Sequence, residues 1–389
     1  MHPMDLDTLI GWQDLLTEEE ATVRSTVGRF VDQRAIPRIG ADFEAGRFPS
    51  ELVPELADMG LLGANLEGYG CAGISNVGYG LACMEVERCD SGLRSFVSVQ
   101  TSLAMYAIWK YGSEEQKRHW LPQMATGKKI GCFGLTEPEH GSNPAGMTTR
   151  AVRDGTDWVI TGEKMWITNA QIADVAIVWA REGDGGRVMG FIVEKGARGF
   201  SAHDIPHKMS MRASFTGSLN LDAVRLPESS RLPHGVGIAA PLGCLDNARF
   251  GVAFGVLGAA RDCFDRARQY SLDRKQFGVS IGSKQLLQAR LAEMASEIVK
   301  ASVLSLHYGR LKDAGKLSSV QTSVLKRNNC RIALDIARQS RALMGANGIT
   351  VDYGVIRHML NLESTFTYEG TDEIHTLVIG RAVTGESAF

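Results

Sequence analysis

One carboxylate near the end of the chain is a candidate general base. The segment Tyr368-Glu369-Gly370-Thr371 precedes a predicted last helix, for which Thr371 is a favourable N-cap residue. Glu369 is therefore not needed for capping. Between an aromatic ring and a glycine it can face a pocket, where loss of solvation raises the pKa of a carboxylate and makes it a stronger base. The alternative is an ordinary solvated loop carboxylate.

A second group of residues suggests recognition of an anionic substrate. The run 84–103 predicts one amphipathic helix, and helical spacing aligns on one of its faces the polar residues Glu87, Ser91, Arg94, Ser98 and Ser102. An arginine in a largely apolar pocket is unfavourable unless an anion meets it. This face therefore suggests a substrate with a carboxylate at its far end. The alternative is a surface ion pair between Arg94 and Glu87 or Asp90.

The composition describes an ordinary globular protein of 389 residues with a net charge of -2, which gives no reason to expect nucleic acid as a partner. Seven cysteines without CxxC spacing favour a reducing compartment and predict no metal site. No segment is long and apolar enough for a membrane span, so we expect a soluble, cytoplasmic protein. A glycine cluster at 68–73 lacks strand–loop–helix context, which leaves a phosphate-binding role without support.

The elements that must position these residues fall into three blocks. Capping boxes at Thr17 and Ser113 predict helix starts in the first block. In the second block the hydrophobic period changes from 3.6 to 2, which predicts a small antiparallel β domain, a barrel or sandwich, with strands at 157–161, 164–168, 173–180, 187–193 and 218–225. Long amphipathic patterns, such as 285–311 and 319–344, then predict a helical bundle. The predicted class is mostly α with a β middle domain, and the predicted units are 1–129, 130–235 and 236–389.

Several strings in the same order resemble signatures of the acyl-CoA dehydrogenases. They are Phe133-Gly134-Leu135-Thr136-Glu137-Pro138, Trp166-Ile167-Thr168, Asp273-Arg274-Lys275-Gln276-Phe277-Gly278, Met344-Gly345-Ala346-Asn347-Gly348 and Tyr368-Glu369-Gly370-Thr371. The resemblance covers essentially the whole chain. It implies an N-terminal helical domain, a β domain and a C-terminal four-helix bundle, with FAD as cofactor in a homotetramer.

The resemblance also implies which residues contact FAD. On the flavin side these are Phe133, Leu135, Thr136, Gly141, Ser142, Trp166, Ile167, Thr168, Thr371 and Glu373. A neighbouring subunit would reach the adenosine half through Arg274, Phe277, Gln285, Leu343, Met344 and Gly345. From the residues alone, Trp166 could instead be a β-core aromatic side chain, and Gly345 could simply terminate a helix.

The string Glu87-Arg88-Cys89-Asp90-Ser91-Gly92-Leu93-Arg94-Ser95 resembles the glutaryl-CoA dehydrogenase branch of that family. This likeness implies that Arg94 and Ser98 hold a distal carboxylate, that Glu87 tunes Arg94, and that Glu369 removes the α-proton of the thioester. The other implied substrate contacts are Ser95, Ser142, Leu245, Asn247, Arg249, Tyr368 and Gly370.

The implied reaction converts glutaryl-CoA to crotonyl-CoA and CO2, with electrons passed to electron transfer flavoprotein. Leu93, Phe96 and Val97 depart from the pattern expected for that branch, so the length of the diacid and the decarboxylation stay open. The alternatives are a non-decarboxylating dehydrogenase or an enoyl-CoA reductase for another short-chain or dicarboxylyl-CoA, and a non-catalytic binding protein with the same fold.

Overall fold

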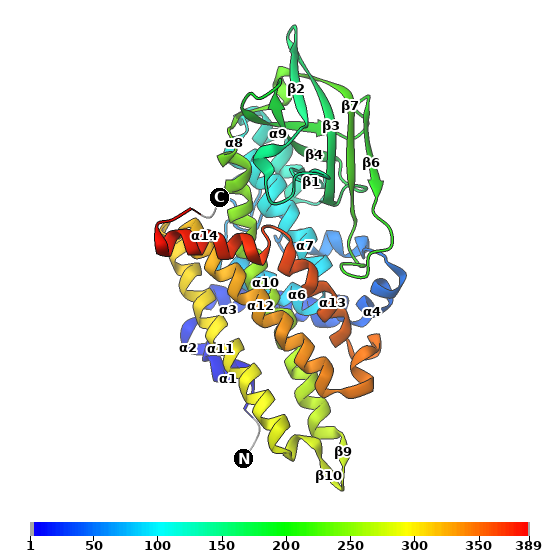
Figure 1. Cartoon of the computed structure of the whole chain (residues 1–389), viewed down its shortest axis with the longest axis vertical. Coiled ribbons are helices and arrows are strands. Elements are labelled where there is room, and N and C mark those ends of the chain that lie inside the picture. The colour runs from blue at the N-terminus through cyan, green and yellow to red at the C-terminus, as the bar shows by residue number, and fades with distance from the viewer. Residues whose placement is uncertain (1–3, 388–389) are drawn as a thin grey trace.

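The computed structural model describes residues 4–387, and its helices and strands form an elongated molecule with a β-sheet at one end and long helices at the other (Figure 1). Helices precede the sheet in the chain and long helices follow it. The prediction of a mostly α chain with a β middle domain is therefore confirmed.

The first block consists of mostly short helices. Thr17 and Ser113 form the predicted capping boxes at the starts of α3 and α9. The helices are α1 (Leu6–Ile10), α2 (Trp12–Leu15), α3 (Glu18–Phe30), α4 (Ile36–Ala45), α5 (Val53–Asp58), α6 (Asn76–Cys89), α7 (Ser91–Ser98), α8 (Tyr106–Tyr111) and α9 (Glu114–Ala125), with π-helical turns at Val31–Ala35 and Val99–Met105 and a 3₁₀ turn at Ser50–Leu52.

The prediction of one continuous helix over 84–103 is wrong. Asp90 adopts an extended conformation with φ -163° and ψ 139°, which ends α6 and starts α7. The Asp90 carboxylate accepts a hydrogen bond from the Gly92 amide at 2.7 Å, so it serves as the N-cap of α7. Asp competes with the helical backbone in this way, and helical periodicity alone does not reveal such a break.

The middle block forms one sheet of eight strands in the order β6-β7-β3-β2-β4-β5-β8, with β1 paired to β4. Most neighbours are antiparallel as predicted, but β1–β4 and β2–β4 are parallel. The runs 157–161 and 164–168 form one strand with irregular register against β7. The strands are β1 (Gly131–Gly134), β2 (Arg150–Asp154), β3 (Asp157–Thr168), β4 (Val175–Glu182), β5 (Val188–Glu194), β6 (Phe200–Asp204), β7 (Thr216–Pro227) and β8 (Arg231–Val236).

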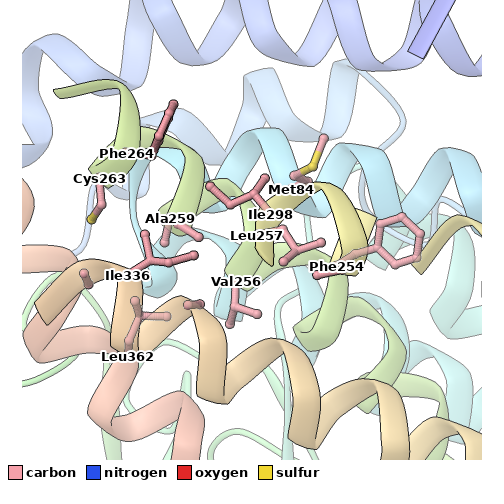
Figure 2. Close-up of a cluster of buried hydrophobic side chains, with 14 of the residues drawn as sticks. Met84, Phe254, Val256, Leu257, Ala259, Cys263, Phe264, Ile298, Ile336 and Leu362 are labelled. Atoms are coloured by element: carbon pink, nitrogen blue, oxygen red, sulfur yellow. The ribbon is translucent and has the colours of Figure 1, made fainter. Parts of the chain in front are cut away.

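The last block packs long helices around an apolar core formed by side chains such as Phe254, Leu257, Ile298 and Ile336 (Figure 2). Its elements are α10 (Ala239–Asp273), α11 (Gln285–Asp313), α12 (Ser319–Leu343), α13 (Val355–Thr367) and α14 (Asp372–Thr384), with a small hairpin of β9 (Lys275–Gln276) and β10 (Val279–Ser280).

Two glycines of α10 set how closely α6 packs on that helix. A Cβ at Gly258 would lie 1.8 Å from the Met84 carbonyl oxygen, and one at Gly255 would lie 2.2 Å from Glu87 Oε2. At Gly258 the clash is with the backbone, so only glycine allows this separation of the helices, whereas at Gly255 the Glu87 side chain would have to move. The close packing brings the polar end of α6 against α10.

Within residues 4–387, no helix is long and apolar enough to cross a membrane. All seven cysteines are free thiols, and all but the half-buried Cys71 are buried, as expected for small apolar side chains.

Candidate active site

Glu369 lies in the short connection between α13 and α14, where Thr371 caps α14 by accepting a hydrogen bond from the Ile374 amide at 3.3 Å. Glu369 has φ +53°, in the left-handed region that non-glycine residues rarely adopt. Such a conformation costs of order 1 kcal/mol or more and persists only where the surroundings impose it.

Two cations from different helices hold this connection. Arg249 of α10 donates from Nε to the Glu369 carbonyl oxygen at 2.7 Å, and Lys326 of α12 donates from Nζ to the Gly370 carbonyl oxygen at 2.8 Å. Arg249 also pairs with Asp246 through Nη1 at 2.6 Å. The Glu369–Gly370 peptide and the peptide that follows it are thus each held by a cation from a different helix.

The Glu369 side chain does not behave as a solvated loop carboxylate. Its Oε2 atom is buried and has no hydrogen-bond partner in the part of the chain that the structure describes. Burial raises the pKa of Glu369, and the charges of Arg94, Arg249 and Lys326 oppose that rise. A carboxylate with a raised pKa that still ionises is what proton abstraction requires.

Arg94 lies completely buried and forms an ion pair with Glu87, whose side chain is equally buried, at 2.5 Å between Nε and Oε2. Its Nη2 group donates to the Tyr368 hydroxyl, one residue before Glu369. The alternative of a surface ion pair is therefore wrong. Asp90 is not a partner of Arg94, because its carboxylate accepts from Arg357 and Asn361 at 2.8 Å each.

Several polar atoms around this pair are buried and unused. Among residues 4–387, Arg94 Nη1, Glu87 Oε1 and Ser98 Oγ have no hydrogen-bond partner. Ser98 follows Arg94 by one helical turn on α7, and Ser95 is buried on the same helix. A buried polar group without a partner costs about 1–3 kcal/mol, so this cluster of donors and acceptors is suited to a polar ligand.

Two of the segments expected to contact the flavin lie side by side where β1 ends and along the last residues of β3, and we call this end of the sheet the flavin edge. Met165 donates its amide to the Thr136 carbonyl oxygen at 2.9 Å, and Lys164 donates from Nζ to the Leu135 carbonyl oxygen at 3.1 Å. The segments 133–136 and 164–168 therefore lie side by side. Phe133, Leu135 and Ile167 are buried, Thr136 and Thr168 are half-buried, and Gly141 and Ser142 are exposed.

Trp166 is 57 % exposed and has φ +63°. The alternative that it is a β-core aromatic residue is therefore wrong. An indole held on the surface in an unfavourable backbone conformation next to Thr136 is a surface for a planar ligand.

Lys164 and Glu137 form a buried ion pair that joins the two segments of this edge. Their side chains are buried and pair at 2.8 Å, and the Glu137 carboxylate also accepts from the Thr148 and Thr149 amides at 2.6 and 3.0 Å. Burial lowers the pKa of Lys164 to about 8. Burial tends to raise the pKa of Glu137, but Lys164 and the amides lower it to about 2.

Leu245 and Asn247 precede Arg249 on α10 by four and two residues, and the Asn247 Nδ2 atom is buried without a partner in the described chain. Asn247, Asp246 and Lys312 line a pocket of about 240 Å³. This pocket lies on the same stretch of α10 that holds the Glu369 connection.

A further group of predicted residues lies far from the sheet, at the β9–β10 end of the bundle (Figure 1). Phe277 is 92 % exposed there, Arg274, Gln285 and Gly345 are exposed, and Leu343 and Met344 are buried. Arg274 and Met344 line a pocket of about 510 Å³. Within one chain these residues are not brought to the flavin edge. Glu373 is exposed at the start of α14.

The sequence patterns predict no role in the site for Gly255 or Lys326. Gly255 lets Glu87 and Arg94 pack on α10, and Lys326 contacts the Glu369 connection. Both contacts join residues far apart in the chain, and no local pattern in the sequence indicates them.

Comparisons with known proteins cover nearly the whole chain. Models of the acyl-CoA dehydrogenase N-terminal, middle and C-terminal domains match residues 17–128, 132–224 and 235–384. A short-chain specific acyl-CoA dehydrogenase of Clostridium acetobutylicum is 35 % identical, over 94 % of this chain and 97 % of that protein. A crystal structure of glutaryl-CoA dehydrogenase from Mycobacterium smegmatis is 56 % identical with TM-score 0.97, and one in complex with FADH2 is 52 % identical with TM-score 0.98; each covers 100 % of both chains.

Proposed function

The chain belongs to the acyl-CoA dehydrogenase family, and we propose from that premise that it oxidises glutaryl-CoA at the α,β-carbons, with Glu369 as base and Arg94 as the residue that binds the distal carboxylate. It is an acyl-CoA dehydrogenase, and its cofactor is FAD. The observation that carries the substrate proposal is Arg94, a completely buried guanidinium one turn from the unpartnered Ser98 hydroxyl.

The charge balance around Arg94 supports a dicarboxylyl substrate. Glu87 neutralises the guanidinium through Nε, which makes the buried cation tolerable before substrate binds. Nη1 of Arg94 and Oγ of Ser98 stay available as donors on the same face of α7. A carboxylate that accepts from both would satisfy two buried groups with charge-assisted hydrogen bonds.

The chemistry assigned to this chain begins with proton abstraction. The α-proton of a thioester is weakly acidic, so the Glu369 carboxylate must be held against it, and burial makes that carboxylate a stronger base than it would be in water. The Glu369 amide makes no hydrogen bond within residues 4–387, and it is available to donate to the thioester carbonyl. FAD, when bound, supplies the acceptor for the hydride that leaves the β-carbon.

The residues present fit this cofactor. Trp166 offers an exposed indole face beside Thr136, and the buried Lys164–Glu137 pair fixes the two segments on which these residues lie. The exposed Arg274 and Phe277 at the other end of the bundle suit an arrangement in which a second copy of the chain completes the adenosine end of the site. The further FAD and substrate contacts expected from the sequence are proposed on the same basis.

Several finer features belong to this proposal. We propose decarboxylation of the oxidised product to crotonyl-CoA, electron transfer to electron transfer flavoprotein, a homotetramer and a cytoplasmic location. Exposed apolar side chains at Phe277, Leu286 and Ile349 support assembly through the far end of the bundle. Units of 1–129, 130–235 and 236–389 remain the proposed division of the chain.

An Arg94→Gln variant tests the substrate assignment. Anaerobic bleaching of the flavin by glutaryl-CoA should become at least about 100-fold less efficient, because a buried carboxylate loses its charged partner. Bleaching by butyryl-CoA should change much less, and Arg94→Lys should recover only part of the loss because lysine lacks the planar fork. Equal losses on both substrates would contradict the proposal.

A second candidate function is dehydrogenation of a short unbranched acyl-CoA, because the 35 % identical Clostridium relative is described as short-chain specific. Under this alternative butyryl-CoA would be the better substrate of the unaltered enzyme. Measuring CO2 released from glutaryl-CoA by the purified enzyme separates decarboxylation from simple dehydrogenation.

A further inference from the structure

Lys326 carries a buried ammonium group, and the packing of its own helix, α12, does not require a charge at this position. Its side chain is 1 % exposed, and no carboxylate in residues 4–387 lies within ion-pair distance of it. Burial lowers its pKa, as expected for an ammonium without a carboxylate partner. A lysine in such a position is unfavourable for folding, which indicates that its contacts serve another purpose.

Those contacts are all with the chain around Glu369. Nζ donates to the Gly370 carbonyl oxygen at 2.8 Å and lies 3.5 Å from the carbonyl oxygen of Phe366 in the last turn of α13. A cation at a helix C-terminus is favourable because the free carbonyl groups there carry partial negative charge. Lys326 therefore links the end of α13 to the residue that follows Glu369.

The two anchored carbonyl groups are that of Glu369, which has the unfavourable backbone conformation, and that of the following residue, Gly370. Arg249 holds the Glu369 carbonyl oxygen and Lys326 holds the next one along the chain. These two hydrogen bonds, from α10 and α12, hold the segment in which Glu369 adopts its left-handed φ of +53°. Loss of one anchor would let the connection relax towards an ordinary conformation and redirect the carboxylate.

The charge of Lys326 acts on the same carboxylate. The charged groups that face Glu369 are Arg94 of α7, Glu87 of α6, Arg249 of α10 and Lys326 of α12. Lys326 in turn faces the Cys330 thiol on its own helix, Arg249, Glu369 and Asp372 of α14, and the His375 imidazole of α14 is affected by it. The three cations together oppose the effect of burial on Glu369.

We propose that Lys326 is a positioning residue for the base, which holds the Glu369 connection through the Gly370 carbonyl group and places a positive charge near the Glu369 carboxylate. This inference rests on the proposed role of Glu369. It assigns to Lys326 a role in the active site that the stability of α12 does not require.

Variants of the full-length holoenzyme separate the two effects. Lys326→Met removes the charge and the hydrogen bond, Lys326→Gln keeps a donor but removes the charge, and Lys326→Arg keeps both. In Lys326→Met the acidic limb of the pH profile for flavin bleaching by acyl-CoA should move up by about one pH unit, since the charge that favours ionised Glu369 is gone. Lys326→Gln should show the same shift, and Lys326→Arg should lie near the unaltered enzyme.

A readout independent of turnover is hydrogen–deuterium exchange of the backbone at 368–371. Exchange there should be faster in Lys326→Met than in the unaltered enzyme. It should be slower in Lys326→Gln than in Lys326→Met, because only Lys326→Gln retains a donor for the Gly370 carbonyl group. Arg331→Gln is the matched control, because this variant also removes a positive charge from α12. Arg331 pairs with the Asp372 side chain and does not bind the carbonyl groups around Glu369.

The outcomes are distinguishable. Unchanged pH midpoints and exchange in Lys326→Met, or the same shift in Arg331→Gln, would overturn the inference. Should Lys326→Met fail to fold, Lys326→Gln against Lys326→Arg gives the same comparison of charge. Glu369→Gln tests the underlying function separately: if that variant still bleaches the flavin at the normal rate, the base assignment is wrong whatever Lys326 does.

Discussion

Glu87 and Arg94 form a buried ion pair across the break between α6 and α7, with 2.5 Å between Oε2 and Nε. The break at Asp90 separates the two helices, and Gly255 on α10 leaves the space that both side chains occupy. Arg94 of this pair donates to the hydroxyl group of Tyr368, the residue that precedes Glu369. The proposed recognition of the distal carboxylate and the proposed proton abstraction are therefore joined by one chain of contacts.

Gly255→Ala should damage this pair more than it stabilises α10. A Cβ at this position would lie 2.2 Å from Glu87 Oε2 and 3.0 Å from Arg94 Nε, so both side chains must move. Alanine favours a helix by up to about 1 kcal/mol over glycine, but overpacking typically costs about 1–3 kcal/mol. We expect a lower melting temperature and at least a tenfold loss of kcat/KM for glutaryl-CoA. An unchanged kcat/KM would show that the pair is not needed for substrate binding.

Glu87→Gln should reveal how the pair balances charge. The glutamine keeps the shape but leaves the Arg94 guanidinium buried without its anion, which typically costs about 3–5 kcal/mol of stability. Because a substrate carboxylate could then take the anion's place, glutaryl-CoA should raise the melting temperature of this variant more than that of the unaltered enzyme. Thermal unfolding with and without the substrate analogue measures the difference, and butyryl-CoA serves as the control ligand.

Glu369→Gln should lose activity and gain stability at neutral pH. Burial raises the pKa of Glu369 in the folded protein above its value of about 4.5 in the unfolded chain, so ionisation is less favourable when folded. The stability advantage of the variant should be absent below pH 4.5, grow as the pH rises through the folded pKa, and then stay constant. Because Glu369 is partly exposed, we expect no more than about 1 kcal/mol. Chemical unfolding at several pH values tests this, and a variant less stable at pH 7 would contradict it.

Glu137→Gln should weaken the flavin edge through Lys164. Removing one partner of a buried pair leaves the other uncompensated and typically costs about 3–5 kcal/mol. Adding Lys164→Met should recover part of this loss, so the double variant should be more stable than the two single effects predict. The folded pKa of Glu137 is about 2, so its contribution is complete above pH 4.5 and is lost as the pH falls towards 2. Strictly additive effects in urea unfolding would mean that the pair is not coupled.

Phe277→Ser should affect assembly without affecting the fold of one chain. The side chain is 92 % exposed on the β9–β10 hairpin, so it contributes little to the core of its own subunit. If the far end of the bundle is an interface that completes the FAD site, the variant should sediment as a smaller species and retain less FAD after dialysis. Leu9→Ser is the matched control, because Leu9 is also an exposed apolar residue but lies near the N-terminus.

Local patterns in the sequence were sufficient for most of the secondary structure. The capping boxes at Thr17 and Ser113 and the N-cap at Thr371 lie where they were predicted, because each depends only on residues within one helical turn. The β1, β2, β6 and β8 strands were not predicted, because β1 and β2 have only four and five residues, β6 is short and largely exposed, and β8 lacks a clear alternation of apolar side chains. The break at Asp90 was missed because its cap forms with Gly92 within an otherwise helical pattern.

The order of the helical and β blocks follows from local patterns of residues, and the same patterns single out Glu369 and Arg94 as residues whose chemistry needs explanation. Three further features depend on how distant segments pack: Arg94 is buried against Glu87, Asp90 pairs with Arg357 instead, and Lys326 reaches the Gly370 carbonyl group. These two kinds of feature differ in how far apart along the chain the interacting residues lie. Helix caps and periodicity depend on neighbours along the chain, whereas burial and charge pairing depend on which distant helices pack together.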